Sequence, residues 1–415
     1  MTATPVIYNL FPLLAGPFPQ WTPHLERARD MGFNWIYFNP VSYPGFSGSL
    51  YSIKDYYGFH PMLAPDGDAQ AAQAFADVLA RMGKMGLSPM MDLVVNHTAI
   101  DSPLIDSHPG WFARDNDGKP LRPGAMDGGE WVTWGDLATV DNTGSADRAA
   151  LWDYWDRLIA HHQALGVKGF RCDAAYHVPA ALWRHLIGHA RTRDPEVRFF
   201  AETLGCQVED VEILAQAGFS YVFNSSKWWD YVEPWCLEQY EKTRVLVPSI
   251  AFAESHDTPR LARETGGDVG QILARQAFAT AFSTGVMMTM GFEFAATRPL
   301  NVVRTRPDDW LQRPGTATDL TAAITEINAL KTTHPALRLE GPMVWVDIGP
   351  APVTTLDKFT PDGTRKVRIR ISQKPGEPVP NDPGDDFAEA TEITPDCLLT
   401  HHAPFRLFAD GAPQP

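Results

Sequence analysis

Hydrophobic runs alternate with amphipathic segments along most of the 415-residue chain. The short runs are rich in β-branched and aromatic residues and predict strands, whereas the longer segments repeat apolar residues with helical spacing. The predicted strands are Val6–Leu10, Asn34–Asn39, Ser88–Val95, Gly169–Cys172, Phe199–Ala201, Tyr221–Phe223, Ile250–Ala253 and Val286–Met290. The predicted helices include Ala69–Met85, Asp147–Leu165, Ala180–Thr192, Val208–Ala217, Gln271–Phe282 and Thr318–Lys331. This alternation is typical of a parallel sheet with crossover helices.

The order of these elements predicts an α/β fold, a (β/α)8 TIM barrel whose active site lies at the carboxyl ends of the strands. A doubly wound open sheet is the rival, but no Gly-rich phosphate turn follows the first predicted strand. The connection after His97 is long, polar and rich in Gly, Pro, Asp and Trp, which predicts a small loop domain inserted after strand 3. We therefore assign residues 1–96 and 143–337 to the catalytic barrel and residues 97–142 to the inserted loop domain.

Helical periodicity stops after about Leu337. Thr354–Thr360 and Lys366–Ser372 flank a Pro361-Asp362-Gly363 turn, which predicts a β-hairpin. The segment Lys374 to Glu392 is rich in proline and acidic residues, which indicates a solvated loop. Residues 338–415 are thus predicted to form a short C-terminal β-domain.

The overall composition narrows the choice of partners. The chain is 44% hydrophobic and 20% charged, as in globular proteins, and its net charge of −15 argues against binding nucleic acid. The four cysteines are widely scattered without metal-ligand spacing, which indicates reduced thiols. No stretch approaches the ~20 apolar residues needed to cross a bilayer, and Met1–Pro5 lacks the features of a secretory leader. We expect a cytoplasmic protein without a membrane or nucleic-acid partner.

Four of the predicted strands end in charged or polar side chains. They are found in Met91-Asp92-Leu93-Val94-Val95-Asn96-His97, Gly169-Phe170-Arg171-Cys172-Asp173, Phe199-Phe200-Ala201-Glu202 and Phe252-Ala253-Glu254-Ser255-His256-Asp257. A carboxylate delivered by a buried strand is costly unless it is solvated, paired or used in chemistry. Since parallel strands end at one mouth of a barrel, these residues together indicate a catalytic site.

These four segments, in this order, resemble the motifs of the α-amylase family, glycoside hydrolase family 13. The first is similar to Asp-x-Val-x-Asn-His, the second to Gly-x-Arg-x-Asp, the third contains Glu202, and the fourth matches at Ser255-His256-Asp257. Trp134-Gly135-Asp136-Leu137 is similar to an extra motif of the family's loop domain, and Tyr51 resembles its sugar-stacking tyrosine. The resemblance extends from Ile7 to about Trp310.

The resemblance implies a retaining mechanism with Asp173 as nucleophile, Glu202 as general acid/base and Asp257 as transition-state stabiliser. Such chemistry requires two carboxyls ~5–5.5 Å apart, one to attack the anomeric carbon and one to protonate the leaving oxygen. Arg171 lies two residues before Asp173 and on the same side of the strand, so it can help to keep the nucleophile ionised.

The resemblance also implies a binding site for the sugar. Tyr51, His97, Arg171 and His256 are the expected substrate-binding residues, and an α-glucan oligosaccharide is the expected partner. The chemistry needs no cofactor, but many family members bind a structural calcium. The positions that match its ligands are the Asn96 side chain, the Asp136 carboxylate and the His177 main-chain carbonyl.

Structural roles compete with functional ones at several positions. Asp92 fits a structural carboxylate at a strand end, and Tyr51 could pack in a loop instead of stacking on sugar. Trp228 and Trp229 fit a sugar platform and a core position equally well. Asp173 and Glu202 could also serve only as ion-pair partners of Arg171.

The expected activity is that of an α-amylase-type glycosidase acting on α-1,4-linked glucose oligosaccharides such as maltodextrin or glycogen. A maltosyltransferase or another α-glucan transglycosylase is the alternative, because both use the same covalent intermediate and differ in the acceptor. His256 before Asp257 argues against the subgroup that uses maltose 1-phosphate, in which we expect this histidine to be replaced. Tyr176 stands where many starch hydrolases carry a lysine that contacts the leaving sugar. A non-catalytic carbohydrate-binding relative is disfavoured because Arg171 and all three carboxyl groups are present.

Overall fold

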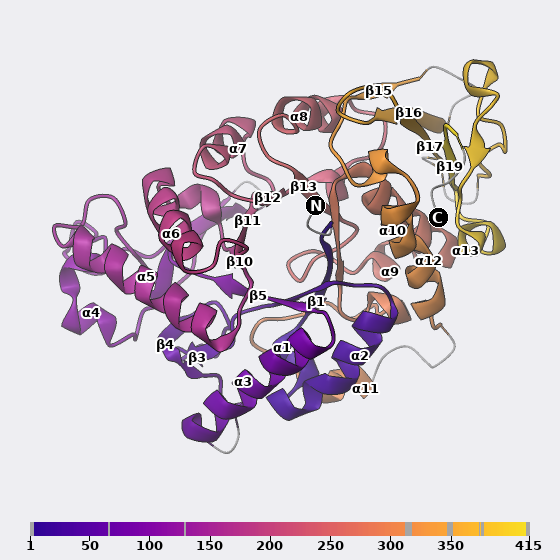
Figure 1. Cartoon of the computed structure of the whole chain (residues 1–415). Helices are drawn as coiled ribbons and strands as arrows, with labels where there is room; N and C mark the ends of the chain where they lie inside the picture. Colours follow the sequence, from indigo (N-terminus) through magenta and orange to yellow (C-terminus); the bar gives the residue numbers. More distant parts are fainter. Residues whose placement is uncertain are drawn as a thin grey trace.

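The computed structural model describes residues 4–64, 67–127, 130–311, 318–346, 352–372, 374 and 377–411. At its centre is a closed barrel of parallel strands in the order β1-β14-β13-β12-β11-β10-β5-β2 (Figure 1). The barrel strands are β1 Val6–Leu10, β2 Trp35–Phe38, β5 Ser88–Leu93, β10 Gly169–Cys172, β11 Arg198–Glu202, β12 Tyr221–Phe223, β13 Ser249–Phe252 and β14 Gly285–Thr289. The predicted (β/α)8 barrel is thereby confirmed.

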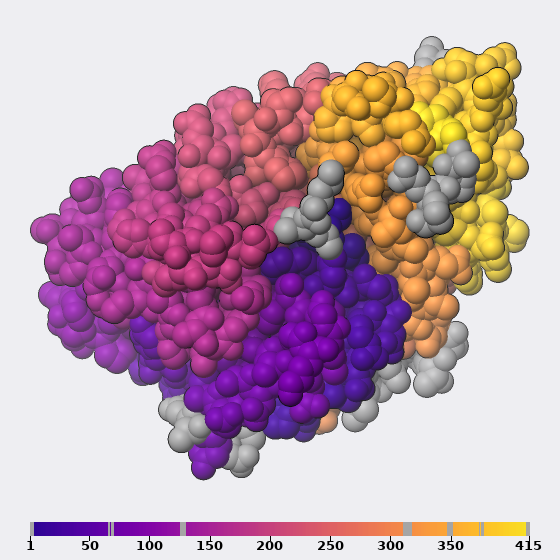
Figure 2. Space-filling model, in the orientation of Figure 1, coloured from indigo at the N-terminus to yellow at the C-terminus, as the bar shows by residue number. Residues whose placement is uncertain are grey.

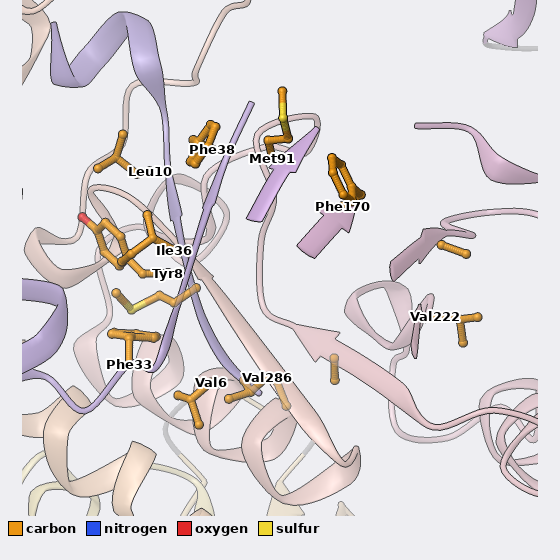
Figure 3. Close-up of a cluster of buried hydrophobic side chains, with 14 of the residues drawn as sticks. Val6, Tyr8, Leu10, Phe33, Ile36, Phe38, Met91, Phe170, Val222 and Val286 are labelled. Atoms are coloured by element: carbon orange, nitrogen blue, oxygen red, sulfur yellow. The ribbon is translucent and has the colours of Figure 1, made fainter. Parts of the chain in front are cut away.

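Residue alternation along the strands builds two apolar layers. Side chains such as Ile7, Trp35, Met90 and Phe200 form one buried cluster that fills the barrel. The alternate positions form a second cluster between the strands and the surrounding helices, which includes Tyr8, Ile36, Phe38, Met91, Phe170 and Val286 (Figure 3). Because both faces of each strand are buried, the strands appear in the sequence as nearly continuous hydrophobic runs.

Helices surround the barrel. They are α1 Pro12–Ala15, α2 Thr22–Asp30, α3 Asp68–Lys84, α5 Arg148–Leu165, α6 Ala180–Arg193, α7 Val208–Ala215, α8 Trp235–Thr243, α9 Leu261–Glu264, α10 Val269–Phe282, α11 Asp308–Leu311 and α12 Thr321–Thr333. Short 3₁₀ turns are η1 Phe18–Trp21, η3 Ala175–His177, η4 Ser226–Trp228, η5 Phe292–Phe294 and η6 Pro335–Leu337. In α5 the buried residues Leu151, Trp155, Leu158, Ile159 and His162 recur at helical spacing. This helix ends at Gly166, whose φ of 108° is accessible without steric cost to glycine.

Two segments of the chain, one before β5 and one after it in sequence, form small antiparallel structures outside the barrel. The first is the β3–β4 hairpin, with β3 Ser42–Pro44 and β4 Ile53–Phe59. The second, between β5 and β10, contains β6 His97–Ala99, α4 Leu104–Ser107, η2 Pro109–Trp111, β7 Gly124–Asp127, β8 Glu130–Thr133 and β9 Leu137–Thr139. β6 pairs with β9 in antiparallel fashion, and β7 pairs with β8.

The C-terminal residues form an antiparallel sheet in the order β15-β16-β17-β19-β18. Its strands are β15 Met343–Trp345, β16 Val353–Phe359, β17 Lys366–Ser372, β18 Thr391–Glu392 and β19 Phe405–Ala409, and it is accompanied by η7 Asp385–Phe387 and α13 Asp396–Thr400. The pairing of β16 with β17 confirms the predicted hairpin. In Figure 2 this part, coloured from light orange to yellow, lies at one side of the molecule. Hydrogen bonds from Lys358 Nζ to Ala281 O (3.0 Å) and from Tyr240 Oη to Gly341 O (2.9 Å) join it to the barrel.

No helix among the described residues combines the length and the apolar character that crossing a bilayer requires.

Candidate active site

Arg171 is the centre of the polar cluster at the carboxyl ends of the barrel strands. The strand register pairs it with Asp92 on β5 and with Phe200 on β11. Its Nη1 lies 2.9 and 3.0 Å from the two oxygens of Asp92 and 2.8 Å from Asp173 Oδ1, whereas its Nη2 lies 2.9 Å from Glu202 Oε2. The arginine is only 4% exposed. One buried guanidinium therefore brings together two of the predicted catalytic carboxyls.

The cluster contains more carboxylates than the guanidinium can neutralise. Burial raises the pKa of the Asp173 carboxyl well above its ordinary value, and the like charges of Glu202, Asp92 and Asp257 raise it further. The guanidinium of Arg171 opposes this rise. We infer that the cluster retains a proton at pH values where exposed carboxyls are ionised.

The backbone after Asp173 positions Glu202. Ala174 adopts a φ of 38°, in the left-handed region that is unfavourable for residues with a Cβ. This turn directs the Ala174 N–H to Glu202 Oε2, at 2.7 Å. Glu202 Oε2 thus receives both a backbone N–H and a guanidinium nitrogen, and its side chain stays 19% exposed at the pocket.

Asp257 lies beside His256 and opens to solvent. His256 Nε2 is 2.9 Å from Asp257 Oδ2, and the aspartate side chain is 50% exposed. Partial burial raises the pKa of Asp257, but His256 and Arg171 outweigh it, so the net pKa lies below the ordinary value. The lowered pKa favours the ionised form of Asp257.

Tyr51 connects the histidine to the carboxylate cluster. Its ring lies parallel to that of His256, with a centroid separation of 5.7 Å. Its hydroxyl donates to Asp92 Oδ2 (2.7 Å) and lies 2.7 Å from His256 Nε2. The predicted substrate-binding residues Tyr51, Arg171 and His256 thus belong to one continuous network.

Tyr37 and Asn39 complete this network, and the sequence analysis did not single them out. Tyr37 Oη donates to Asp92 Oδ2 at 2.7 Å, and Asn39 Nδ2 donates to Tyr51 Oη at 2.9 Å. The Asp92 side chain has no exposed surface, as expected for a structural carboxylate. Alternation along Asn34–Asn39 was the available signal, because it places Trp35, Tyr37 and Asn39 on one face of the strand.

His97 lies on the loop-domain side of the network. Its Nε2 is 3.1 Å from the Tyr51 carbonyl oxygen, and the residue is 5% exposed. Burial lowers the pKa of His97 to about 4, so its imidazole is neutral at neutral pH.

The residues proposed for calcium lie near His97. Asp136 and His177 both interact electrostatically with the His97 imidazole. Asn96 Oδ1 is buried and has no hydrogen-bond partner among the described residues. A buried oxygen without a hydrogen-bond partner fits a ligand of a hard cation. No group of three or more His, Cys, Asp and Glu side chains that could hold a metal occurs in the described part of the chain, but the expected calcium set includes only one such side chain as ligand.

A pocket lies at the catalytic cluster. It is lined by Tyr37, Arg171, Glu202, Leu204, Phe223, Phe252, Ser255, His256, Asp257 and Met287. Apolar side chains from the barrel interior thus form part of its wall, and the polar network forms the rest. The two tryptophans after β12 differ: Trp229 is 1% exposed and belongs to the core, whereas Trp228 is 51% exposed.

Comparisons with known proteins agree with this architecture. Residues 6–113 match the family model described as the glucanotransferase domain of glycogen debranching enzyme. An alpha-1,4-glucan:maltose-1-phosphate maltosyltransferase of Burkholderia pseudomallei is 30% identical over 365 residues, which cover 85% of this chain and 31% of that protein. The protein of the same name from Myxococcus xanthus is 24% identical, with 86% of this chain and 55% of the relative covered. Among solved structures, an alpha-amylase from Lactobacillus plantarum superposes with a TM-score of 0.75 at 20% identity and covers 98% of this chain and 99% of its own.

The chain is related to the α-amylase family. The amylase structure supports the shared barrel fold, and the maltosyltransferases are the relatives by sequence. The chain spans between about a third and just over half of the length of these two curated relatives.

Proposed function

We propose that this chain is a retaining α-glycosidase of the α-amylase type, acting on α-1,4-linked glucose oligosaccharides such as maltodextrin or glycogen. The observation that carries this proposal is the bridging of Asp173 and Glu202 by the two terminal nitrogens of Arg171, at 2.8 and 2.9 Å. Carboxyls held on one guanidinium lie close together, which favours the ~5–5.5 Å separation of a retaining enzyme over the wider spacing of an inverting one.

In the proposed first step, Asp173 attacks the anomeric carbon while Glu202 donates its proton to the glycosidic oxygen. The bond between that carbon and oxygen breaks, the shortened glucan leaves, and a covalent glycosyl–Asp173 ester remains. This step requires a proton on Glu202 and an ionised Asp173. Glu202 Oε2 accepts hydrogen bonds from Ala174 and Arg171, so Oε1 is the oxygen that carries it.

In the second step, the Glu202 carboxylate takes a proton from an incoming hydroxyl, whose oxygen attacks the anomeric carbon and displaces Asp173. The hydroxyl belongs to water in hydrolysis and to a sugar in transfer. We assign Asp257 and His256 to the sugar hydroxyls, where hydrogen bonds that strengthen in the transition state stabilise the oxocarbenium-like form. Tyr51 and His97 complete the proposed sugar site.

We also propose that Asn96, Asp136 and His177 can hold a structural calcium at the junction with the segment after β5. The buried, unpaired Asn96 Oδ1 supports this assignment. The ion would hold that segment against the barrel and has no part in the proposed bond-breaking steps. The cytoplasmic location stays a prediction from the sequence.

A maltosyltransferase is the second candidate. It is favoured by the relatives, which are named as maltosyltransferases that use maltose 1-phosphate. The glycosidase is favoured by the presence of His256 before Asp257, because we expect the maltose 1-phosphate subgroup to replace this histidine. The two activities share the glycosyl–Asp173 intermediate and differ in the group that resolves it.

The test is incubation with maltotriose through maltoheptaose, with and without inorganic phosphate, followed by chromatography of the products. We expect glucose or maltose without longer oligomers. Longer oligomers would make the chain a transglycosylase, and a sugar phosphate would identify the phosphate-linked maltosyltransferase. Absence of any product from every oligosaccharide would contradict the catalytic proposal.

A further inference from the structure

A second groove lies beside the catalytic pocket, on the other side of the end of β13. Its volume, which includes space open to solvent, is about 920 Å³. It is lined by residues 226–231, by the end of β13, by α9 and by one face of α10. Phe252 lines both this groove and the catalytic pocket. None of the residues assigned above to catalysis or to sugar binding lines the second groove.

Trp228 gives the groove a fixed, half-exposed aromatic surface. The indole is 51% exposed, and Lys227 Nζ lies 5.0 Å from its ring centroid. Lys227 is itself held by Glu264 at 2.8 Å, and only 4% of the lysine side chain is exposed. Exposing this much apolar surface is unfavourable in water. Because the C–H face of a pyranose ring is apolar, its burial against a held indole removes apolar area on both sides from water.

The charged groups of the groove balance one another. Lys227 and Glu264 form an ion pair, and Asp230 and Arg275 contribute one further charge of each sign. Arg275 Nη1 donates to the Trp229 carbonyl (2.9 Å), and its guanidinium lies 4.5 Å from the Tyr231 ring centroid. The groove therefore offers hydrogen-bond donors and acceptors without a dominant sign. This combination suits a neutral ligand rich in hydroxyl groups rather than an anion or a cation.

We propose that this groove is a second carbohydrate-binding site, which holds a segment of an α-glucan chain away from the bond that is cleaved. The proposal rests on the proposed function, because it takes α-glucan as the ligand of the neighbouring catalytic pocket. A chain long enough to occupy both sites gains affinity through the high effective concentration of its second segment. A short oligosaccharide that fills the catalytic pocket alone gains nothing from the groove.

The test compares kcat/KM for amylose with kcat/KM for maltotriose in the full chain. In Trp228→Ala we expect the amylose-to-maltotriose ratio to fall by about tenfold, because only the long substrate uses the groove. Trp228→Phe keeps an aromatic face and should keep most of the ratio. Ile213→Ala is the matched control, because Ile213 is 52% exposed on α7 and does not line the groove.

Retardation in a native gel that contains amylose gives a measurement independent of turnover. The wild type and Ile213→Ala should be retarded more than Trp228→Ala. An unchanged ratio, or an equal loss on both substrates, would overturn the proposal. The gel also separates the two proposals if the wild type hydrolyses neither substrate. Retardation of the wild type that is lost in Trp228→Ala would then refute the proposed catalytic function but support the second binding site. A wild type that is not retarded would refute both proposals.

Discussion

Two clusters of charge in this molecule differ in how their signs balance. At the barrel mouth, the single guanidinium of Arg171 contacts three carboxylates. In the C-terminal sheet, Arg368 pairs with Asp357 at 2.6 Å and with Asp386 at 2.7 Å, and Lys366 pairs with Asp357 at 2.7 Å. The sheet thus sets two cations against two anions, whereas the barrel mouth has an excess of anions.

We expect this difference in charge balance to distinguish a stabilising cluster from a reactive one. A buried ion pair whose charges and hydrogen bonds are all matched has little reason to exchange protons. An excess of carboxylates around one cation holds a proton that is available for transfer, at a cost in stability. Burial and charge of themselves are therefore poor indicators of function, and the imbalance between the signs is the informative quantity.

The largest expected effect is on turnover. Asp173→Asn keeps the shape of the side chain but removes the nucleophile, so we expect kcat to fall by about 10⁴-fold or more on any cleavable α-glucoside. Asp357→Asn makes the same chemical change beside Arg368 in the C-terminal sheet and should leave kcat within about twofold, because substitutions at sites that share no partners act independently. Initial rates on maltoheptaose decide the matter. Near wild-type turnover in Asp173→Asn would refute the assignment of the nucleophile.

The second expected effect is on stability, where Asp357→Asn should be the more damaging of the same two substitutions. Asp357→Asn leaves the buried Arg368 short of a partner and should lower the free energy of unfolding by about 3 kcal/mol. Asp173→Asn removes one of three like charges around Arg171, so its free energy of unfolding should equal or exceed that of the wild type. Urea denaturation at neutral pH measures both. A large loss of stability in Asp173→Asn would mean that the barrel cluster is as structural as the sheet cluster.

The contrast also explains how far sequence reasoning reached. The bounds of β1, β10 and β12 were predicted without error, because strands buried on both faces are short, nearly continuous apolar runs. The hairpin of β16 and β17 followed from its turn residues. The short strands β6 and β9 were not predicted, because they are held by pairing with each other rather than by their own residue pattern.

For the candidate site, the sequence identified the residues at the strand ends but not the hydrogen bonds between them. Tyr37 lay within a predicted strand, yet its bond to Asp92 depends on the closure that places β2 next to β5. The left-handed backbone conformation of Ala174 could not be predicted, because alanine rarely adopts it and the sequence gives no signal for it. The exposure of Trp228 and the burial of Trp229 likewise depend on tertiary packing.

A substitution with a smaller expected effect tests the hydrogen-bond network of the barrel cluster. Tyr51→Phe removes the hydroxyl between Asp92 and His256 while keeping the stacked ring, and we expect kcat/KM to fall by about tenfold, the cost of one hydrogen bond to a charged group. Tyr240→Phe removes a hydroxyl that donates to the Gly341 carbonyl and should affect stability alone. Equal kcat/KM in the Tyr51 variant and the wild type would place Tyr51 outside the catalytic network.

The smallest effects are in the pH dependence of stability, where the two clusters should differ in sign. The pKa of Asp173 is raised in the folded state, so the folded protein binds more protons than the unfolded chain above about pH 4, and this group makes stability fall as pH rises from there. The guanidinium of Arg368 lowers the pKa of Asp386 to about 2, so its contribution is present above pH 4 and is lost as pH falls towards 2. Both pH dependences are tested by measuring the free energy of unfolding of each variant between pH 2 and pH 7 and subtracting it from that of the wild type. The advantage of Asp173→Asn over the wild type should grow as pH rises above 4, and the deficit of Asp386→Asn should shrink below pH 4. Since Asp386 is 54% exposed, solvent keeps its effect small, and the opposite signs rather than the sizes are what distinguish an unbalanced cluster from a balanced one.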